Sequence, residues 1–408
     1  MDSHSLITSL VIALVLAFIF GFAAQRLRLS PLVGYLMAGV AVGPYTPGYV
    51  GDSALAQQFA EIGVILLMFG VGLKFSISDL WAIRRVALPG ALVQMAFATA
   101  LGFALGRLLG LAAPESFLLG FSLSVASTVV LLRALEERNL LKGENGRICV
   151  GWLVVEDIAI VLGIVLLPAV LAALAGDNGG ASAAPAFGEV AGTLGLAMGK
   201  VAVFVALMLA VGGRVFPWLI VRIAHTKSRE LLSLGTLALA LGIAYAAYEF
   251  FGASFALGAF LAGLALNGSK LSHKVAEDSL PLRDTFAVLF FVSVGMLFDP
   301  MSLIERPLAV LGVTAIILFG KSLAALAITT LFKLPLPTGL LIAASLAQIG
   351  EFSFVLAGLG RQLGVFSLDS YNLVLAGALI SIALNPFLFA FAEAAGKRAP
   401  KLAPAGDG

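Results

Sequence analysis

Apolar stretches long enough to cross a lipid bilayer recur along the whole chain, and no other feature constrains its fold as strongly. A helix needs roughly 20 mainly apolar residues to cross about 30 Å of hydrocarbon. Such windows lie between charged or Pro- and Gly-rich breaks, at residues 6–24, 31–47, 58–73, 86–106, 114–134, 148–174, 190–213, 231–251, 253–269, 285–298, 308–331, 337–360 and 370–394. Only 12% of the residues are charged, about half the fraction of a soluble domain. The sequence therefore predicts an all-α membrane protein with 13 transmembrane helices.

The basic residues are distributed by side of the membrane. If the loops after odd-numbered windows are cytoplasmic, these loops, counted with Arg133 at the adjoining end of window 5, and the C-terminal end hold 20 of the 25 Lys and Arg residues. The opposite loops hold three, Arg107, Arg306 and Arg361, and two more, Lys200 and Lys321, fall within windows. Cytoplasmic loops of membrane proteins carry the excess of Lys and Arg. We therefore expect a multi-pass protein of the bacterial inner membrane with a periplasmic N-terminus and a cytoplasmic C-terminus.

An internal repeat relates the two halves of the chain at an offset of about 223 residues. Three segments match in order: SPLVGYLMAG (30–39) with SFALGAFLAG (254–263), ILLMFGVGLKF (65–75) with VLFFVSVGMLF (288–298), and SLSVASTVV (122–130) with SLAQIGEFS (345–353). The matched windows are seven apart, an odd number, so the second copy crosses the membrane in the opposite direction. Two inverted-topology six-helix repeats are expected. The alternative is a chance likeness between apolar, glycine-rich helices.

Four ionisable side chains lie near the middle of windows: Glu156, Asp157, Lys321 and Glu351. An ionisable group in hydrocarbon costs from about 3 to more than 10 kcal/mol, so each is a functional candidate. Adjacent helical residues point about 100° apart, so Glu156 and Asp157 should have different partners. Pairing Lys321 with one acid lowers the cost of both and leaves the other acid for a proton or a small cation. The structural alternative is an inert ion pair between windows 6 and 11.

The matched windows 5 and 12 carry polar groups that are suited to line an ion site. Ser127 and Thr128 lie in one, and Gln348, Gly350 and Glu351 lie in the other. Inverted repeats often contain interrupted helices whose free carbonyls and half-helix ends bind ions. A crossing of two broken helices is expected here, with Gly350 as one break. Window 5 has no central Gly or Pro, and its hydroxyls can instead bond to carbonyls of the preceding turn.

Other kinds of chemistry leave no signature in this sequence. Cys149 is the only cysteine, and His4, His225 and His273 fall in loops, so no metal beyond transported K⁺ or Na⁺ is expected, and no cofactor. There is no H-E-x-x-H, Walker or G-x-S-x-G motif. The net charge of +2 does not indicate a nucleic-acid partner. We expect a protein that is not an enzyme and does not bind nucleic acid.

Several of these segments together resemble a known family. SPLVGYLMAGVAVGP, LLMFGVGLKFS, the VVED of window 6, FFVSVGM and GEFSFVLAGLG are similar to the Kef/YbaL-type branch of the monovalent cation:proton antiporter-2 family, from about Leu6 to Ala395. The resemblance implies a sodium/proton-antiporter-like fold. It places a transmembrane domain at 1–395, with core helices at about 86–174 and 308–394, dimerisation helices at about 6–73 and 231–298, a linker helix at about 190–213 and a cytoplasmic tail at 396–408.

The resemblance also implies roles for individual residues. Asp157 matches the ion-carrying aspartate, Lys321 the basic residue facing it, and Glu156 the variable preceding position, which is Gln in glutathione-gated Kef systems. Relatives usually form homodimers and continue into a cytoplasmic nucleotide-binding regulatory domain, whereas this sequence stops soon after Lys401. The loop from Lys270 to Asp284 resembles the family's regulatory loop, although a charged loop is more often solvated surface.

These expectations converge on a monovalent cation (K⁺ or Na⁺):proton antiporter that works by alternating access around a buried carboxylate. Asp157 would carry the ion, with Glu156, Ser127, Thr128, Gln348 and Glu351 lining the site and Lys321 as charge partner. The alternative is a gated potassium efflux channel or leak pathway. A channel needs a water-filled selectivity path, and no TVGYG-like filter is present in the sequence. A structural or sensory subunit would leave the buried acids unexplained.

Overall fold

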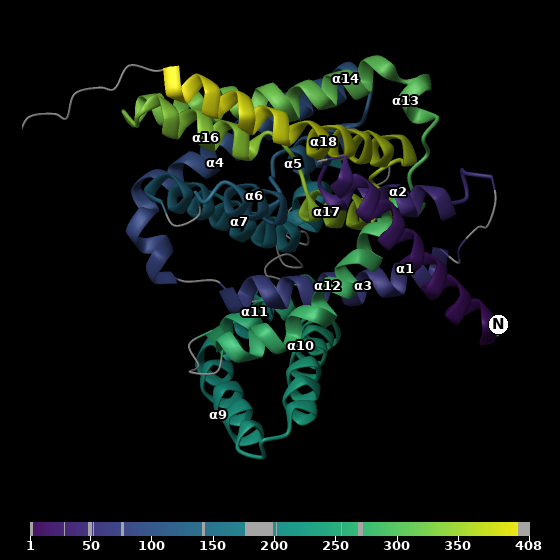
Figure 1. The fold of residues 1–408 in the computed structure, drawn as a ribbon, viewed down its shortest axis with the longest axis vertical. Helices are drawn as coiled ribbons and strands as arrows, with labels where there is room; N and C mark the ends of the chain where they lie inside the picture. Colours follow the sequence, from purple (N-terminus) through teal and green to yellow (C-terminus); the bar gives the residue numbers. More distant parts are fainter. Residues whose placement is uncertain are drawn as a thin grey trace, which may run out of the picture. The chain divides into compact units, whose positions relative to one another are not determined.

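The computed structural model describes residues 3–27, 29–47, 51, 53–74, 77–140, 143–175, 199–200, 202–253, 255–267 and 272–398. Within these ranges the chain is helical, with no strand (Figure 1). It divides into two compact units. The first unit contains Met1–Ala23, Gly34–Ser76 and Val161–Phe298, and the second contains Ala24–Val33, Ile77–Ile160 and Asp299–Gly408. Each unit therefore combines segments from both halves of the sequence.

The first unit is built around closely packed glycine-rich helices. Its main elements are α1 (Ser3–Arg26), α2 (Pro31–Val42), α3 (Ser53–Lys74), the π-helical turn η1 (Met208–Gly212), α9 (Gly213–Ala224), α10 (Arg229–Phe251), α11 (Phe255–Asn267) and α12 (Ser272–Met296). Helix α3 packs along α11 and α12. A Cβ on Gly72 would overlap the backbone around Gly263, and one on Gly39 would overlap the backbone around Gly295. Small residues at these two crossings let the helix backbones touch, as is common in membranes.

The second unit carries most of the buried polar side chains. Its elements are α4 (Ile77–Leu108), α5 (Ala113–Leu123), α6 (Thr128–Glu137), the part of α7 (Glu144–Ala175) up to Ile160, α13 (Ser302–Glu305), α14 (Pro307–Ala315), the π-helical turn η2 (Ile316–Gly320), α15 (Lys321–Leu331), α16 (Leu336–Leu346), α17 (Glu351–Gln362) and α18 (Leu368–Arg398). Helix α4 packs on α5, α15 packs on α16, and α18 packs on α14 and α16. These pairs bury the positions around two helix interruptions.

Both interruptions lie in the second unit. The first separates α5 from α6 at residues 124–127, and the second separates α16 from α17 at residues 347–350. They touch one another, because a Cβ on Gly350 would overlap the side chain and backbone of Ser127. Gly350 has an extended backbone (φ −144°, ψ −151°), so this close approach, and not a positive φ, requires glycine. Both expected helix breaks are present and touch one another, and the break without Gly or Pro is the one at residues 124–127.

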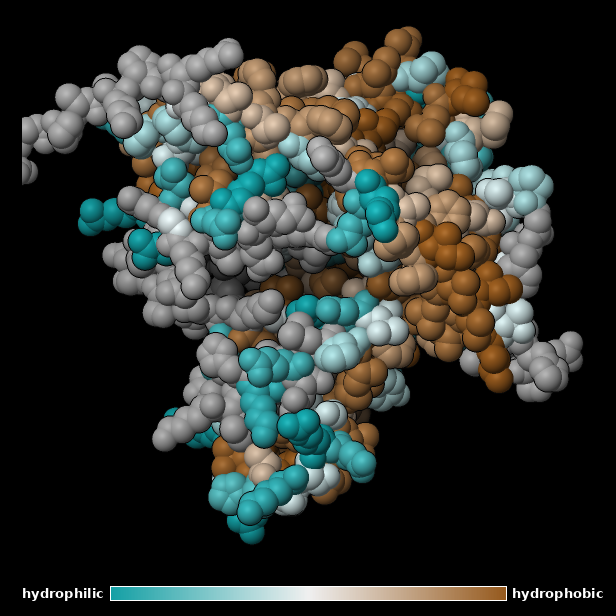
Figure 2. Space-filling model, in the orientation of Figure 1, coloured by the Kyte–Doolittle hydropathy of each residue, from teal (hydrophilic) through white to brown (hydrophobic). Residues whose placement is uncertain are grey.

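The exposed faces of the helices fit a lipid environment. By length and composition, seven described helices can cross a membrane: Ile7–Arg26, Arg85–Leu108, Ala202–Ala224, Arg229–Phe251, Pro307–Leu331, Leu336–Gln362 and Leu368–Gly396. Leu308 and Leu311 of α14 and Phe18 of α1 are among many large apolar side chains that point outward. Figure 2 shows apolar residues over α13 and α14, and hydrophilic residues at the tip of the α9–α10 hairpin. This pattern is typical of a multi-pass membrane protein.

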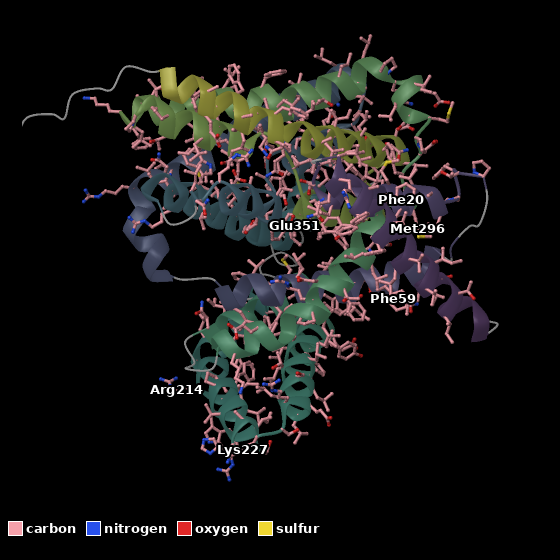
Figure 3. The ribbon with its side chains drawn as sticks, viewed as in Figure 1. Phe20, Phe59, Arg214, Lys227, Met296 and Glu351 are labelled. Carbon is pink, nitrogen blue, oxygen red and sulfur yellow. The ribbon has the colours of Figure 1, made fainter. Side chains whose placement is uncertain are left out.

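Some helix ends differ from the expected windows. The span expected at 190–213 continues as helix to Ala224, although residues 190–198 lie outside the described residues. The charged segment expected to be a loop at Lys270–Asp284 is helical from Ser272 onward, as part of α12. Helices continue past the hydrophobic window because their backbone hydrogen bonds do not depend on side-chain polarity. Arg214, labelled on the hairpin in Figure 3, lies in this continuation of the helix, and its Nη1 donates to the carbonyl of Ala210 at 2.6 Å.

Candidate functional site

The backbone of the first interruption is held by groups from helices distant in sequence. Ala126 N donates to Glu156 Oε2 at 2.9 Å, and Ser127 N donates to Gln348 Oε1 at 2.9 Å. Gln348 Nε2 returns a hydrogen bond to Ser127 O at 3.0 Å. Backbone groups freed at helix ends need such partners when they are buried. The side chains of Glu156 and Gln348 therefore satisfy backbone groups of the non-helical segment between α5 and α6.

Lys321 holds the second interruption. Its side chain is fully buried, and Nζ donates to the carbonyl of Gln348 at 3.0 Å. It follows directly after η2, and π-helical turns inside helices are often found at functional sites. We expected an ion pair with one acid, but no ion pair among the described residues includes Lys321. Its charge acts on Glu156 through space, so the two remain electrostatic partners without a direct bond.

Three carboxyl groups are buried around the two interruptions. Glu156, Asp157 and Glu351 are 0%, 3% and 2% exposed. Thr128 Oγ1 donates to Asp157 Oδ2 at 2.9 Å, and Ser127 Oγ donates to Glu351 Oε2 at 2.8 Å. Glu351 begins α17, where Figure 3 labels it. Asp157 Oδ1 has no hydrogen-bond partner among the described residues, so this acid keeps one oxygen for a ligand, whereas Glu156 also faces the indole of Trp152.

The charges of this cluster do not balance. If all four groups were ionised, the three carboxylates and the one ammonium group would have a net charge of −2. Both Glu351 and Glu156 act electrostatically on Asp157, so the acids share one electrostatic environment. Burying an uncompensated charge costs many kcal/mol, and such groups are found paired, protonated or bound to cations. The cluster is suited to take up protons or small cations in exchange for one another.

All the residues that the sequence singled out for the site come together in the second unit. They are Ser127, Thr128, Glu156, Asp157, Lys321, Gln348 and Glu351. Sequence reasoning missed Gln94, which is fully buried on α4 and donates from Nε2 to Ser124 O at 3.3 Å. It also missed the backbone of Ala126 as a ligand of Glu156. A polar amide in the middle of window 4 was the signal that could have identified Gln94.

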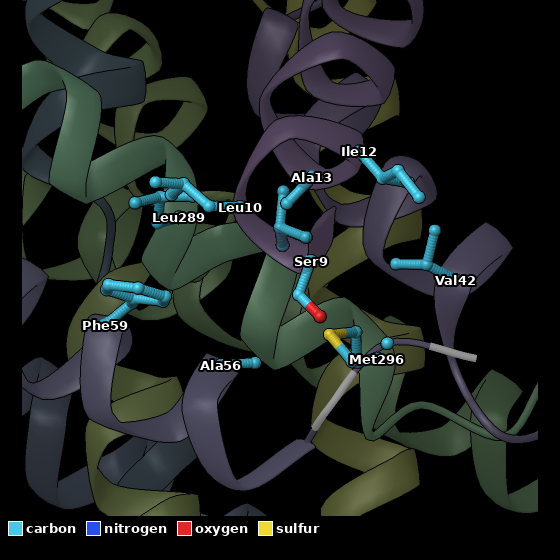
Figure 4. Close-up of a pocket in the computed structure, with 11 residues that line it drawn as sticks. Ser9, Leu10, Ile12, Ala13, Val42, Ala56, Phe59, Leu289 and Met296 are labelled. Carbon is cyan, nitrogen blue, oxygen red and sulfur yellow. The ribbon is translucent and has the colours of Figure 1, made fainter. Parts of the chain in front are cut away.

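An apolar pocket in the first unit is a different kind of feature. Figure 4 shows it between side chains that include Leu10, Val42, Phe59 and Met296. Among the described residues that line it, Ser9 has the only polar side chain. A monovalent cation needs several oxygen ligands in place of its hydration shell. This pocket therefore does not match an ion site, and the candidate site is the acid cluster of the second unit.

The fold, with two touching helix interruptions around buried acids, is that of a secondary transporter. The sodium proton antiporter MjNhaP1 from Methanocaldococcus jannaschii has the same fold, with a TM-score of 0.73 at 18% identity over 97% of this chain and 98% of that one. The family described as "Sodium/hydrogen exchanger, transmembrane" matches residues 11–392. The chain belongs to this sodium/hydrogen exchanger family of cation/proton antiporters.

Within the family the chain belongs to the Kef/YbaL-type branch. It is 58% identical to YbaL of Escherichia coli, a predicted cation/proton antiporter, over 95% of this chain and 68% of that protein. It is 33% identical to the glutathione-regulated potassium-efflux system protein KefC of Klebsiella pneumoniae, over 95% of this chain and 60% of that protein. K(+) efflux antiporter 4 of Arabidopsis thaliana is 32% identical over 94% of this chain and 63% of its own length. The chain thus spans about two-thirds of these transporters.

Proposed function

We propose that this chain is a monovalent cation:proton antiporter in which K⁺ or Na⁺ and protons compete for Asp157. The observation that carries the proposal is the surplus of buried acid, counted over the residues that the structure describes, around Asp157, whose Oδ1 has no hydrogen-bond partner among them. The names of KefC and of the plant relative favour K⁺ as the cation. Glu156, which stands where glutathione-gated Kef systems have Gln, is a reason to test Na⁺ as well.

Each residue of the site has a proposed part in the exchange. Asp157 binds the cation when ionised and releases it when protonated, because one carboxylate cannot hold both. Thr128 orients Asp157 through its hydroxyl. Glu156 and Gln348 keep the first interruption open, and Glu351 adds a further carboxylate. Lys321 offsets one negative charge and occupies the carbonyl end of α16, where a cation would otherwise be attracted.

The proposed cycle is alternating access, with the second unit as the moving core. The first unit would form the dimerisation domain of a homodimer in the bacterial inner membrane, and the helix formed in part by 202–213 would link the two. The N-terminus would be periplasmic and the C-terminus cytoplasmic. A cytoplasmic nucleotide-binding domain is a proposed regulatory partner. No cofactor is required, since the transported ions are substrates.

Reciprocal contacts support the proposed 13-helix arrangement of two inverted repeats. Gly39 contacts Gly295, and Gly72 contacts Gly263. An offset of 223 or 224 residues exchanges the two pairs, because 39 + 224 = 263 and 72 + 223 = 295. In the second unit, the contact of Gly106 with Ser116 is matched by that of Thr329 with Gly339, again 223 residues later. Contacts that interchange in this way are expected from two copies related by a pseudo-two-fold axis.

Transport by purified protein in proteoliposomes tests the function. We expect K⁺ or Na⁺ gradients to drive proton movement, and Asp157→Asn to abolish it. Asp369→Asn is the matched control, because Asp369 is a half-exposed acid paired with Arg306 at the start of α18. Proton movement at the wild-type rate in Asp157→Asn would refute the assignment. A cation flux without proton movement and faster than about 10⁵ per second would instead identify a leak pathway, since carriers cycle in microseconds to milliseconds.

A further inference from the structure

Gln94 lies next to the proposed ion site, and the sequence alone did not place it there. It is fully buried in α4, and its Nε2 donates to the carbonyl of Ser124, the first residue after α5. One turn earlier on the same face, Gly90 lies against the ring of Trp152 in α7. Trp152 precedes Glu156 by one helical turn. The face of α4 that carries Gln94 therefore packs against the part of α7 that carries the acids.

Gln94 and Lys321 make equivalent hydrogen bonds at the two interruptions. Gln94 donates to a carbonyl just after the end of α5, and Lys321 donates to a carbonyl just after the end of α16. The two side chains come from windows 4 and 11, which the repeat places in correspondence. Lys321 lies four residues, or one helical turn, beyond Ile317, the position that an offset of 223 gives for Gln94. One interruption is thus capped by a neutral amide and the other by a positive charge.

This difference makes the two carbonyl ends electrostatically unequal. The C-terminal end of a helix carries a partial charge of about −0.5 from its free carbonyls. The ammonium group of Lys321 more than cancels that charge at α16, whereas the amide of Gln94 leaves it in place at α5. Asp157, held by Thr128 at the start of α6, lies at the same interruption as the uncancelled end. Gln94 Oε1 also has no hydrogen-bond partner among the described residues.

We propose that Gln94 is a positioning residue that directs the transported cation to the first interruption by capping its carbonyl end without a charge. The inference rests on the proposed antiport function and deepens it, since it assigns the cation to one of two similar helix breaks. Gln94 acts through the Ser124 carbonyl and the field of α5. The neutrality of its side chain is the essential property, and its hydrogen bond supports the geometry.

A purely structural role for Gln94 leads to a different expectation. If only the hydrogen bond mattered, Gln94→Lys would keep a donor for Ser124 O and transport normally, and Gln94→Met would be the impaired variant. Under the proposal, Gln94→Lys is the most impaired, because it places a second positive charge beside the cation. Gln94→Glu removes the donor but adds negative charge, so it should bind the cation at least as well as Gln94→Met.

The experiment measures solid-supported-membrane currents of the three variants over a cation concentration series, with thermal unfolding of each as a check on folding. We expect the KM for the cation to rise about 2- to 10-fold in Gln94→Met, as for loss of one hydrogen bond, and by more than this in Gln94→Lys. Asn372→Leu is the matched control. Its buried amide accepts from Asp299 N, so the variant loses stability but keeps the wild-type KM.

Two results would overturn the inference. The first is a wild-type KM for the cation in Gln94→Lys. The second is a higher KM in Gln94→Glu than in Gln94→Met, and this result decides the question even if Gln94→Lys does not fold. Failure of the proposed function is recognisable separately. If wild-type protein exchanges cations for protons and Asp157→Asn does not, but the Gln94 variants show no ordering by charge, only the role of Gln94 is refuted. If Asp157→Asn transports normally, the antiport assignment itself fails.

Discussion

Ser127 and Gln348, 221 residues apart in sequence, exchange a pair of hydrogen bonds between two interrupted helices. Ser127 N donates to Gln348 Oε1, and Gln348 Nε2 donates back to Ser127 O. The same two segments also touch where Gly350 meets Ser127. The side chain of Gln348 thereby pairs with the backbone of Ser127 and satisfies its N–H, which the helix break leaves without an intrahelical partner. Ser127 O accepts from Leu131 N as well as from Gln348. The two interruptions form one structural element.

Replacing Gln348 with leucine should destabilise this element. The change removes both bonds and leaves the buried N–H of Ser127 without its partner, whereas Ser127 O still accepts from Leu131 N. We expect this loss to cost on the order of 1–3 kcal/mol. The measurement is the thermal unfolding midpoint in detergent. Gln362→Leu, at the exposed end of α17, is the matched control and should leave the midpoint nearly unchanged. Equal midpoints for the two variants would show that the double hydrogen bond contributes little.

Gly350→Ala should separate the two interruptions. The new Cβ would overlap Ser127, so the backbone must move and the hydrogen bonds of Ser127 to Gln348 and Glu351 must lengthen. We expect a strong loss of transport and a lower unfolding midpoint. Gly358→Ala is the control on the same helix, since nothing lies within 4 Å of its added Cβ. The control should be more stable than the parent protein, because alanine in a helix interior stabilises by roughly 0.5–1 kcal/mol over glycine. Transport by Gly350→Ala at the level of Gly358→Ala would contradict the prediction.

The hydroxyl of Thr128 should contribute to cation affinity. Thr128→Val keeps the size and branching of the side chain but removes the donor to Asp157 Oδ2. Loss of a hydrogen bond to a charged group is worth about 1.5–3 kcal/mol, so we expect the KM for the cation to rise at least about tenfold. Thr128→Ser, which retains the hydroxyl, should restore most of the affinity. An unchanged KM in Thr128→Val would show that Asp157 is positioned by other groups.

Lys321 and Glu156 should be coupled in stability more than in ion binding. Lys321→Met leaves the Gln348 carbonyl and the buried acids without their positive charge, and Glu156→Gln removes one of those acids. Each change should lower the unfolding midpoint and alter the charge moved per cycle. The double variant should recover part of the lost stability, with a coupling of about 0.5–3 kcal/mol. Loss of all cation affinity in Glu156→Gln alone would mean that Glu156, and not Asp157, carries the ion.

The membrane character and the positions of the buried charges were predictable from the sequence. A charged residue within a long apolar window stands out in one dimension, because the cost of burying it in hydrocarbon restricts where such residues occur. Glu156, Asp157, Lys321 and Glu351 were found in this way, and all four are buried. The interruption near Gly350 was also predictable, since glycine at the centre of an apolar helix marks a close backbone approach.

The partners of these groups were decided only by the tertiary structure. The interruption at residues 124–127 contains no Gly or Pro and exists because Glu156 and Gln348, from other helices, satisfy its backbone. Lys321 was expected to bind a carboxylate but donates to a carbonyl, because the free end of a half-helix presents an unsatisfied acceptor to it. Gln94 stands out in the sequence as a polar amide within window 4, but its hydrogen bond to Ser124 O was decided by the tertiary structure. The sequence determined which residues must be buried in a bilayer, since that depends on hydropathy along the chain, whereas packing between helices far apart in sequence decided how each polar group is satisfied.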